Sequence, residues 1–299
     1  ERPRLVLTVD NKGFAVRFAS RLKRRMRAVG WSVPIIHCVA PTVWAWGSWR
    51  AKKFAKVVDG LLCLFPFEPD YFKPFKLDAH FIGHPEAFGD FLPAKPVNDS
   101  IEGSKIKFNK VILLPGSRRN EIRLILPEML AATVIIKRHD PNLNFVLPAV
   151  PHLLPLIQNL VVGSDVTILD QPEDLIPALQ TSDAMIATSG TITLQAALCG
   201  TVGVTCYRAS ALSGLIGRWL VDLDKVVLPN AILGRPLYPF YFQEAATGKA
   251  LATATLDYLC DVNAKSRARH AAIELKNLLT GGSQSFDNLV IDALKNWLD

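Results

Sequence analysis

The sequence predicts an α/β protein with two domains, each built on a parallel β-sheet flanked by helices. Short apolar runs of strand length alternate with segments whose apolar residues recur at the helical period, and this alternation is typical of parallel sheets covered by helices. The 299 residues, 49% of them hydrophobic and 20% charged, suffice for two hydrophobic cores and exclude disorder as the main character. A stretch poor in pattern, residues 90–109, separates two such series.

The first series begins with an apolar strand at residues 4–10 that ends in a carboxylate. Residues 14–29 follow with apolar side chains at helical spacing and with Lys and Arg on the other faces. Further strands are expected at 33–39, 61–65 and 79–82. A basic helix face is most often only solvated, and the alternative is contact with anionic lipid head groups.

The second series is expected to place strands at 111–114, 144–147, 166–169 and 184–187, each followed by a helix, with another strand after Gly200. The chain ends in a helix with a regular apolar stripe, which needs a partner surface. Its members are Phe286, Leu289, Val290, Ala293, Leu294, Trp297 and Leu298. We therefore expect a first domain at 1–92, a linker at 93–109, a second domain at 110–280 and a terminal helix at 281–299.

The first candidate for a phosphate-binding turn lies in VILLPGSRRNE, residues 111–121. A strand ends before Gly116 and Ser117, and a helix follows them. Arg118 stands where the positive end of the helix dipole repels a cation, so an anion shared by the helix and the guanidinium is favoured. A guanidinium binds a diphosphate in bidentate fashion. The alternative is an ion pair between Arg118 and Glu121.

The second candidate lies in DAMIATSGTITLQAALCGTVGV, residues 183–204. Ser189, Gly190 and Thr191 stand between an apolar strand and a short helix, whose first amides can bind an anion. Gly190 has no Cβ, which allows a sharp turn and close approach of the backbone to a ligand. Gln195 lies about one helical turn further on, near enough to bond a sugar hydroxyl. The alternative is that Ser189 and Thr191 only cap the helix.

Asp10 is the best candidate for a general base. Open α/β sheets bind ligands beyond the carboxyl ends of their strands, and Asp10 stands at such an end. A carboxylate there can take a proton from an acceptor hydroxyl, although capping of the next helix explains it equally well. The six histidines and five cysteines show no metal-type spacing, so we expect no metal site, and the cysteines are interpreted as buried thiols in a reducing cytoplasm.

The net charge of +7 indicates anionic partners such as phosphates, an acidic membrane face or nucleic acid. Nucleic acid ranks last because no recognised binding module accompanies the basic residues. No apolar run reaches the roughly 18–20 residues that cross a bilayer. The chain begins with Glu1 and enters a core strand almost at once, so we expect the natural protein to start upstream.

Seven short segments extend over nearly the whole chain in the order LTVD, HCVAPTVWAW, LFPFEPDYF, FIGHP, LLPGSRRNE, SGTITLQAAL and LPNAILGRP. Together they resemble the lipid-A-disaccharide synthases, glycosyltransferases of the GT-B type in glycosyltransferase family 19. The resemblance implies two Rossmann-like parallel-sheet domains that face a cleft, the first incomplete at its N-terminus. It also implies that the helix at 281–299 packs back onto the first domain.

The reaction implied by the resemblance joins UDP-2,3-diacylglucosamine to 2,3-diacylglucosamine 1-phosphate, giving the lipid A disaccharide 1-phosphate and UDP. It proceeds with inversion and without a metal or other cofactor, in a cytoplasmic protein peripheral on the inner membrane. The implied partners are these two lipids and the anionic membrane surface, not nucleic acid. The implied catalytic base is Asp10, and the implied substrate-binding residues are Ser117, Arg118, Ser189, Gly190, Thr191, Gln195 and Asn230.

The chain departs from the family pattern at several positions. The family's opening Gly-Glu-x-Ser-Gly-Asp segment is absent, and the small residue and Pro after the base are Asn11 and Lys12 here. An Arg after W-A-W is replaced by Gly47, and two Glu residues are replaced by Gln195 and Phe240. These changes leave open a non-catalytic homologue that binds UDP-sugar or lipid. Another GT-B enzyme, such as a UDP-N-acetylglucosamine 2-epimerase, is the third alternative.

Overall fold

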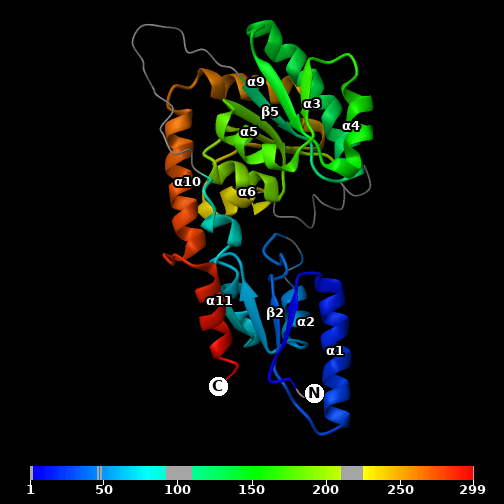
Figure 1. Cartoon of the computed structure of the whole chain (residues 1–299), viewed down its shortest axis with the longest axis vertical. Helices are drawn as coiled ribbons and strands as arrows, with labels where there is room; N and C mark the ends of the chain where they lie inside the picture. Colours follow the sequence, from blue (N-terminus) through cyan, green and yellow to red (C-terminus); the bar gives the residue numbers. More distant parts are fainter. Residues whose placement is uncertain (1–2, 46, 48, 92–109, 210–224, 299) are drawn as a thin grey trace. The chain divides into compact units, whose positions relative to one another are not determined.

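A computed structural model describes residues 3–45, 47, 49–91, 110–209 and 225–298, which fall into two compact units (Figure 1). Among these residues, unit 1 holds those up to Gly89 and those from Lys276 on, and unit 2 holds those between. The expected linker, 93–109, lies outside the described residues.

Unit 1 contains a parallel sheet in the order β1-β2-β3-β4. Its strands are β1 (Val6–Val9), β2 (Ile35–Cys38), β3 (Gly60–Cys63) and β4 (Asp78–Phe81). Its helices are α1 (Lys12–Ala28), α2 (Arg50–Ala55) and α11 (Phe286–Lys295), with 3-10 turns at Pro69–Tyr71, Lys73–Phe75 and Pro85–Phe88. The four strands expected from the sequence are therefore present, with ends shifted by one or two residues.

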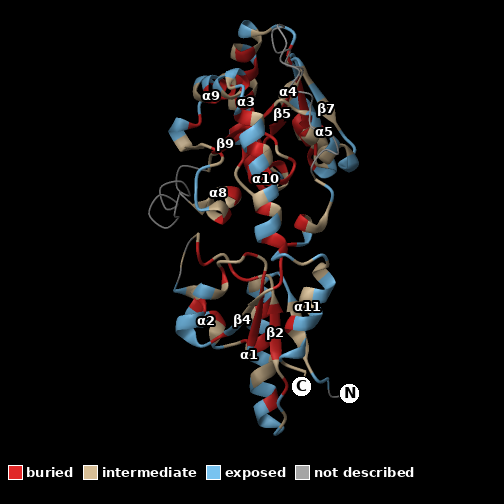
Figure 2. Cartoon of the chain, turned by 90° about the vertical axis from the view of Figure 1, so that its left-hand side faces the viewer, coloured by how far each residue is buried: buried red, intermediate tan, exposed pale blue. Residues whose placement is uncertain are grey.

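The inner strands of unit 1, β2 and β3, are buried on both faces, as strands of a parallel sheet normally are (Figures 1 and 2). On one face, α1 and α2 pack against alternate strand residues such as Ile35 and Leu61. On the other face, α11 packs through Ala293 and its apolar stripe against Ile36 and Leu62. The terminal apolar stripe thus has its partner surface within unit 1.

Unit 2 contains a parallel sheet in the order β10-β9-β8-β5-β6-β7. Its strands are β5 (Lys110–Leu114), β6 (Asn144–Pro148), β7 (Val166–Leu169), β8 (Ala184–Thr188), β9 (Gly203–Tyr207) and β10 (Phe240–Phe242). Its helices are α3 (Arg119–His139), α4 (Leu154–Val161), α5 (Leu175–Thr181), α6 (Thr191–Leu198), α8 (Leu228–Leu233) and α9 (Gly248–Cys260). Short 3-10 turns lie at Pro151–Leu153, Pro172–Asp174 and Gln243–Ala245.

The boundary between the units falls within α10 (Ala264–Thr280), whose residues up to Leu275 belong to unit 2. The core of unit 2 is built on β5, β6 and β8, against which α3 and α9 pack through residues such as Ile122, Ile125 and Leu251. None of the described helices has the length and apolar character needed to cross a membrane.

Candidate functional site

The carboxyl ends of β5 and β8 lie next to each other in the sheet of unit 2. The register pairs Leu114 of β5 with Ala187 of β8. The turns that follow, 115–118 and 189–190, therefore begin about one strand spacing apart, roughly 5 Å. The two turns expected to bind phosphate are thus neighbours, although 73 residues separate Leu114 from Ala187 in the sequence.

The turn after β5 is shaped by a buried carboxylate. Gly116 has a φ of +101°, and a Cβ on it would lie 2.6 Å from Oε2 of Glu121 in the first turn of α3. Glu121 is buried, accepts a hydrogen bond from Nη1 of Arg118 at 2.5 Å, and is also bonded by the hydroxyl of Tyr207 at the end of β9. The carboxylate raises the pKa of Arg118. Ser117 is exposed at the tip of the turn.

The ion pair with Glu121 that the sequence left as an alternative is therefore present. It does not remove Arg118 from solvent, because 77% of the arginine side chain stays exposed. A guanidinium has five N–H donors, so one hydrogen bond to a carboxylate leaves others for an anion. The buried carboxylate thus holds one nitrogen of the guanidinium, while most of the side chain remains accessible.

The turn after β8 leaves open space above the backbone. Ser189 is held at both ends, because its N–H donates to the carbonyl of Cys206 and its hydroxyl to the carbonyl of Val226, each at 2.9 Å. Gly190 is extended, with a φ of 166°, and a Cβ on it would meet no atom within 4 Å. The glycine is thus not required by the backbone conformation, and its effect is to leave room. Thr191, the first residue of α6, is exposed.

Two further polar side chains lie close to this turn. Gln195 is half-buried on α6, one turn beyond Thr191. Thr188, the last residue of β8, is 2% exposed, and its hydroxyl has no hydrogen-bond partner within the described ranges. No pattern in the sequence marks Thr188, since a threonine at a strand end is ordinary.

Asn230 has a structural role in α8. Its Oδ1 accepts hydrogen bonds from the N–H groups of Leu237 and Tyr238, at 2.9 and 3.0 Å, and its Nδ2 donates to the carbonyl of Tyr238. These bonds hold the segment that leads into β10. Asn230 would have to bind substrate, as the sequence predicts, while it keeps these hydrogen bonds.

In unit 1, Asp10 stands just beyond β1, where the chain turns. Asp10 and Asn11 both adopt left-handed backbone conformations, with φ of 49° and 37°. Asn11 caps α1, because its side chain accepts the N–H of Phe14 at 3.2 Å. The capping role that the sequence left open for Asp10 is thus taken by its neighbour, and the Asp10 carboxylate remains exposed.

Two buried titratable groups lie near the carboxyl edge of the same sheet. His37 is fully buried on β2. Its Nδ1 is 2.8 Å from the Thr8 hydroxyl, and its Nε2 has no partner in the described structure. Burial, together with the nearby Lys12, lowers the pKa of His37 to about 4. The histidine is therefore neutral at physiological pH.

Glu68, which follows β3, is the second buried group and was missed in the sequence. Its carboxylate accepts hydrogen bonds at 3.1 Å from the N–H groups of Leu64 and Phe65 and from the indole of Trp44. Burial nevertheless raises its pKa to about 7. No sequence pattern marks a buried glutamate, because its environment is assembled by the fold.

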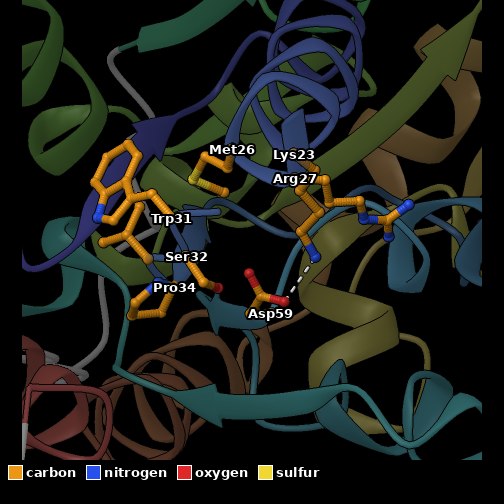
Figure 3. A pocket seen from close by; sticks show the side chains of 8 residues that line it. Lys23, Met26, Arg27, Trp31, Ser32, Pro34 and Asp59 are labelled. Carbon is orange, nitrogen blue, oxygen red and sulfur yellow. Dashed lines mark hydrogen bonds and ion pairs between the residues drawn. The ribbon is translucent and has the colours of Figure 1, made fainter. Parts of the chain in front are cut away.

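A pocket of about 460 Å³ lies at the opposite edge of the unit 1 sheet, near the amino ends of β2 and β3 (Figure 3). It is lined by Lys23, Met26, Arg27, Trp31, Ser32, Val33, Pro34 and Asp59. Nζ of Lys23 donates to Oδ1 of Asp59 at 2.6 Å across it. Because Asp10 stands at the carboxyl end of β1, this pocket is separate from the Asp10 site. Among the described residues, no three His, Cys, Asp or Glu gather in a way that would hold a metal ion.

Two parallel-sheet units of this kind define the GT-B class of glycosyltransferases and sugar-nucleotide epimerases. The chain is similar over 98% of its length to the solved structure of a putative UDP-N-acetylglucosamine 2-epimerase from Listeria monocytogenes, covering 74% of that chain with a TM-score of 0.60 and 13% identity. A spinosyn rhamnosyltransferase solved with thymidine diphosphate matches 97% of this chain and 73% of its own, with a TM-score of 0.55 and 16% identity. At these identities the likeness establishes the fold.

Sequence similarity identifies the family within that class. The lipid-A-disaccharide synthetase family matches residues 1–290. Lipid-A-disaccharide synthases of Burkholderia thailandensis and Burkholderia vietnamiensis are each 38% identical, over 80% and 87% of this chain. The chain belongs to the lipid-A-disaccharide synthetase family. It spans 62% and 66% of the length of these two relatives.

Proposed function

We propose that the protein is an inverting hexosyltransferase that joins UDP-2,3-diacylglucosamine to 2,3-diacylglucosamine 1-phosphate, giving the lipid A disaccharide 1-phosphate and UDP. The family match over residues 1–290 carries this proposal. It favours the synthase over an epimerase, because the epimerases resemble the chain in fold alone, at 13% identity.

Unit 2 supplies the donor site in this proposal. The neighbouring turns after β5 and β8 direct the first amides of α3 and α6 to the carboxyl edge of the sheet, where a diphosphate is bound by helix N-termini. The exposed guanidinium of Arg118 adds charge-assisted hydrogen bonds. Gln195 bonds a ribose hydroxyl from α6, and an amide accepts such a bond less strongly than the carboxylate of the family pattern.

Unit 1 supplies the base. The Asp10 carboxylate removes the proton from the acceptor hydroxyl as the hydroxyl oxygen attacks the anomeric carbon of the donor. The bond from that carbon to the diphosphate breaks, and its electron pair leaves with UDP. Arg118 and the two helix N-termini stabilise the negative charge that develops on the diphosphate. Attack from the face opposite the leaving group accounts for inversion.

The test is UDP release by the full-length protein from the acylated donor, measured with and without the acceptor lipid. We expect release only when the acceptor is present, and we expect Asp10→Asn to abolish it while UDP still binds. Turnover that persists in Asp10→Asn would remove Asp10 from the mechanism. UDP binding without any turnover in the wild type would favour the non-catalytic homologue suggested by Gly47, Gln195 and Phe240.

We also propose that α1 contacts the anionic surface of the inner membrane from the cytoplasmic side. Phe14 and Phe18 are 62% and 38% exposed on this helix and stack with ring centroids 5.8 Å apart. Exposed arginines such as Arg17 and Arg21 accompany them, and this combination of aromatic and basic residues suits a lipid interface. Sedimentation with vesicles tests the proposal: anionic vesicles should carry the protein down, neutral ones should not, and Arg17→Gln with Arg21→Gln should reduce the bound fraction.

A further inference from the structure

The outer face of α2 carries one aromatic and three cationic side chains. They recur at intervals of three and four residues, so they lie on one side of the helix. The members of this α2 stripe are Trp49, Lys52, Lys53 and Lys56, and all of them are exposed. The other side of the helix is buried through Ala51 and Phe54, which belong to the core of unit 1. The helix therefore presents a cationic face with an indole at its start.

Packing does not account for the indole of Trp49, which is 68% exposed. Trp44, in the segment before α2, shows the usual alternative, because it is 5% exposed and its indole N–H donates to Glu68 at 3.1 Å. No described residue forms a hydrogen bond with the side chain of Trp49. An indole combines a large apolar surface with one polar N–H, and such side chains are enriched where a membrane meets water.

The three lysines of the stripe have no acidic partner among the residues that the structure describes. The acidic residues that follow α2 are engaged elsewhere. Asp59 pairs with Lys23 at 2.6 Å, Asp70 pairs with Lys73 at 2.5 Å, and Glu68 is only 2% exposed. The stripe thus keeps its positive charge, and an anionic surface can bind it without displacing an ion pair.

The stripe begins at the same edge of the unit 1 sheet as Asp10. α1 follows the carboxyl end of β1 and α2 follows the carboxyl end of β2, so both helices start at this edge. Both helices also pack on the same face of the sheet. Trp49 and the exposed Phe14 of α1 therefore lie on the side of unit 1 from which a lipid would reach Asp10.

We propose that the α2 stripe is a second contact of unit 1 with an anionic lipid bilayer. The indole of Trp49 lies at the level of the head groups, and the lysines contact lipid phosphates. This contact rests on the proposed function for the lipid nature of the substrates. A bilayer matches the two basic helices better than a nucleic acid or an acidic peptide does, because it is a continuous anionic surface that α1 and α2 can contact together.

The experiment is sedimentation of the full-length protein with vesicles of phosphatidylglycerol and phosphatidylcholine, and with vesicles of phosphatidylcholine alone. The test variant combines Lys52→Gln, Lys53→Gln and Lys56→Gln. Each lysine near an anionic bilayer changes the partition coefficient about fivefold, so we expect the test variant to bind the anionic vesicles at least about 20-fold more weakly. The wild type should bind the neutral vesicles far less than the anionic ones.

A matched control removes the same charge from exposed positions of unit 2. It combines Arg123→Gln, Arg138→Gln and Lys249→Gln. Because these residues lie outside the stripe, the control should lower the partition coefficient on anionic vesicles by less than about threefold. The comparison separates a contact at α2 from a general effect of net charge.

Tryptophan fluorescence reports where the indole lies. The difference between the emission of the wild type and that of Trp49→Phe isolates Trp49 from the other tryptophans, and we expect this difference to shift to the blue when anionic vesicles are added. Trp49→Ala should bind these vesicles at least about fivefold more weakly. Both substitutions leave the core intact, since the side chain is 68% exposed.

The proposal is overturned if the wild type does not bind anionic vesicles, if the test variant binds them as well as the control does, or if the emission of Trp49 does not shift. An oligonucleotide that binds the wild type but not the test variant, while vesicle binding persists in both, would assign the stripe to nucleic acid instead.

UDP release with the acceptor dispersed in a neutral detergent separates this outcome from the fate of the transferase. The test variant should release UDP as the wild type does, because the α2 stripe holds no reacting group. If the test variant loses vesicle binding in a protein that never releases UDP, the membrane contact stands and the reaction does not. If UDP is released and the test variant binds vesicles like the wild type, the reaction stands and the membrane contact does not.

Discussion

Two glycines at the carboxyl edge of the unit 2 sheet differ in what an added methyl group would meet. At Gly190 it would meet nothing within 4 Å in an extended backbone. We therefore predict that Gly190→Ala leaves the free energy of unfolding within about 0.5 kcal/mol of the wild type. The same methyl group would occupy the space above the turn and weaken UDP binding by at least about tenfold. Urea denaturation and isothermal titration calorimetry measure the two effects.

Gly116→Ala is the matched contrast, because its Cβ would clash with Glu121 at a positive φ. It should cost about 1–3 kcal/mol of stability. If Gly190→Ala bound UDP as tightly as the wild type, the space above Gly190 would not be the diphosphate site.

The buried Glu68 gives the second prediction at this scale, a pH dependence of stability. Folding raises its pKa from 4.5 to about 7, so its favourable contribution is complete below pH 4.5 and is lost as the pH rises to about 7. Relative to the wild type, Glu68→Gln should therefore become more stable as the pH rises through this window, by up to about 3 kcal/mol. Urea denaturation of both proteins at several pH values measures the difference.

His37 provides the control of opposite sign. Folding lowers its pKa from 6.5 to about 4, so its contribution is complete above pH 6.5 and is lost as the pH falls toward 4. Relative to the wild type, His37→Gln should gain stability as the pH falls. A Glu68→Gln difference that does not change with pH would show that the carboxyl titrates normally.

Residues near the proposed chemistry could be predicted where the signal is local. Asp10, Arg118 and Gly190 each follow a recognisable apolar strand. The capping role of Asn11 could not be assigned, because Asn and Asp are equally good at a helix start and the backbone decides between them. Glu68 could not be found at all, since Trp44, which donates to it, is 24 residues away in the sequence.

At the scale of elements, the contact of α11 with β3 depends on a glycine. A Cβ on Gly60 would lie 2.3 Å from the ring of Trp297 and 2.7 Å from Cδ1 of Ile36. Gly60→Ala should therefore cost about 1–3 kcal/mol in the wild type, by overpacking. Trp297→Ala should cost about 3–5 kcal/mol, by cavity formation. In the double variant the space left by the indole admits the methyl group. The cost of the double variant should therefore be smaller than the sum of the two single costs, by at least about 1 kcal/mol.

Urea denaturation of the four proteins completes this cycle. Additive costs would mean that Ile36 or a backbone shift, rather than the indole, limits the space at Gly60. Leu289→Ala, which removes another apolar contact of α11 and lies outside the nearest neighbours of Gly60, is the control that should be additive with Gly60→Ala.

Elements were predictable in proportion to how continuous their apolar pattern is. The strands β5, β7 and β8 are uninterrupted apolar runs or alternations bounded by turn residues, and their positions follow from the sequence. β10 was not predicted, because its three half-buried residues follow a Pro-rich segment and become a strand only by pairing with β9. The two long helices before the terminal one, α9 and α10, were not predicted as elements.

At the scale of the whole molecule, each unit has its own buried core. Residues of β1–β4 pack with α1, α2 and α11, and residues of β5–β9 pack with α3 and α9. The alternation of strands and helices was enough to predict two such cores. The position of the boundary within α10 was not predictable, because a continuous helix carries no break in its pattern where one core gives way to the next.

Separate cores lead to a prediction about where UDP stabilises the protein. A ligand that binds only the native state of unit 2 raises its free energy of unfolding by about 2.7 kcal/mol at 100 times the Kd. Hydrogen exchange of the most protected amides in β5, β6 and β8 should then slow about 100-fold, because these amides exchange through unfolding of the unit. Amides of β2 and β3 should exchange at an unchanged rate.

Hydrogen exchange with mass spectrometry measures both sheets in one sample, and Arg118→Met at the same UDP concentration is the control in which the slowing should shrink. Equal slowing in β2 and β3 would mean that the two units unfold as one cooperative block, despite their separate cores. Slower exchange confined to β2 and β3 would mean that UDP binds unit 1 and not unit 2. Slowing confined to the strands of unit 2 would place UDP there independently of any catalytic measurement, since exchange reports binding whether or not the protein turns over.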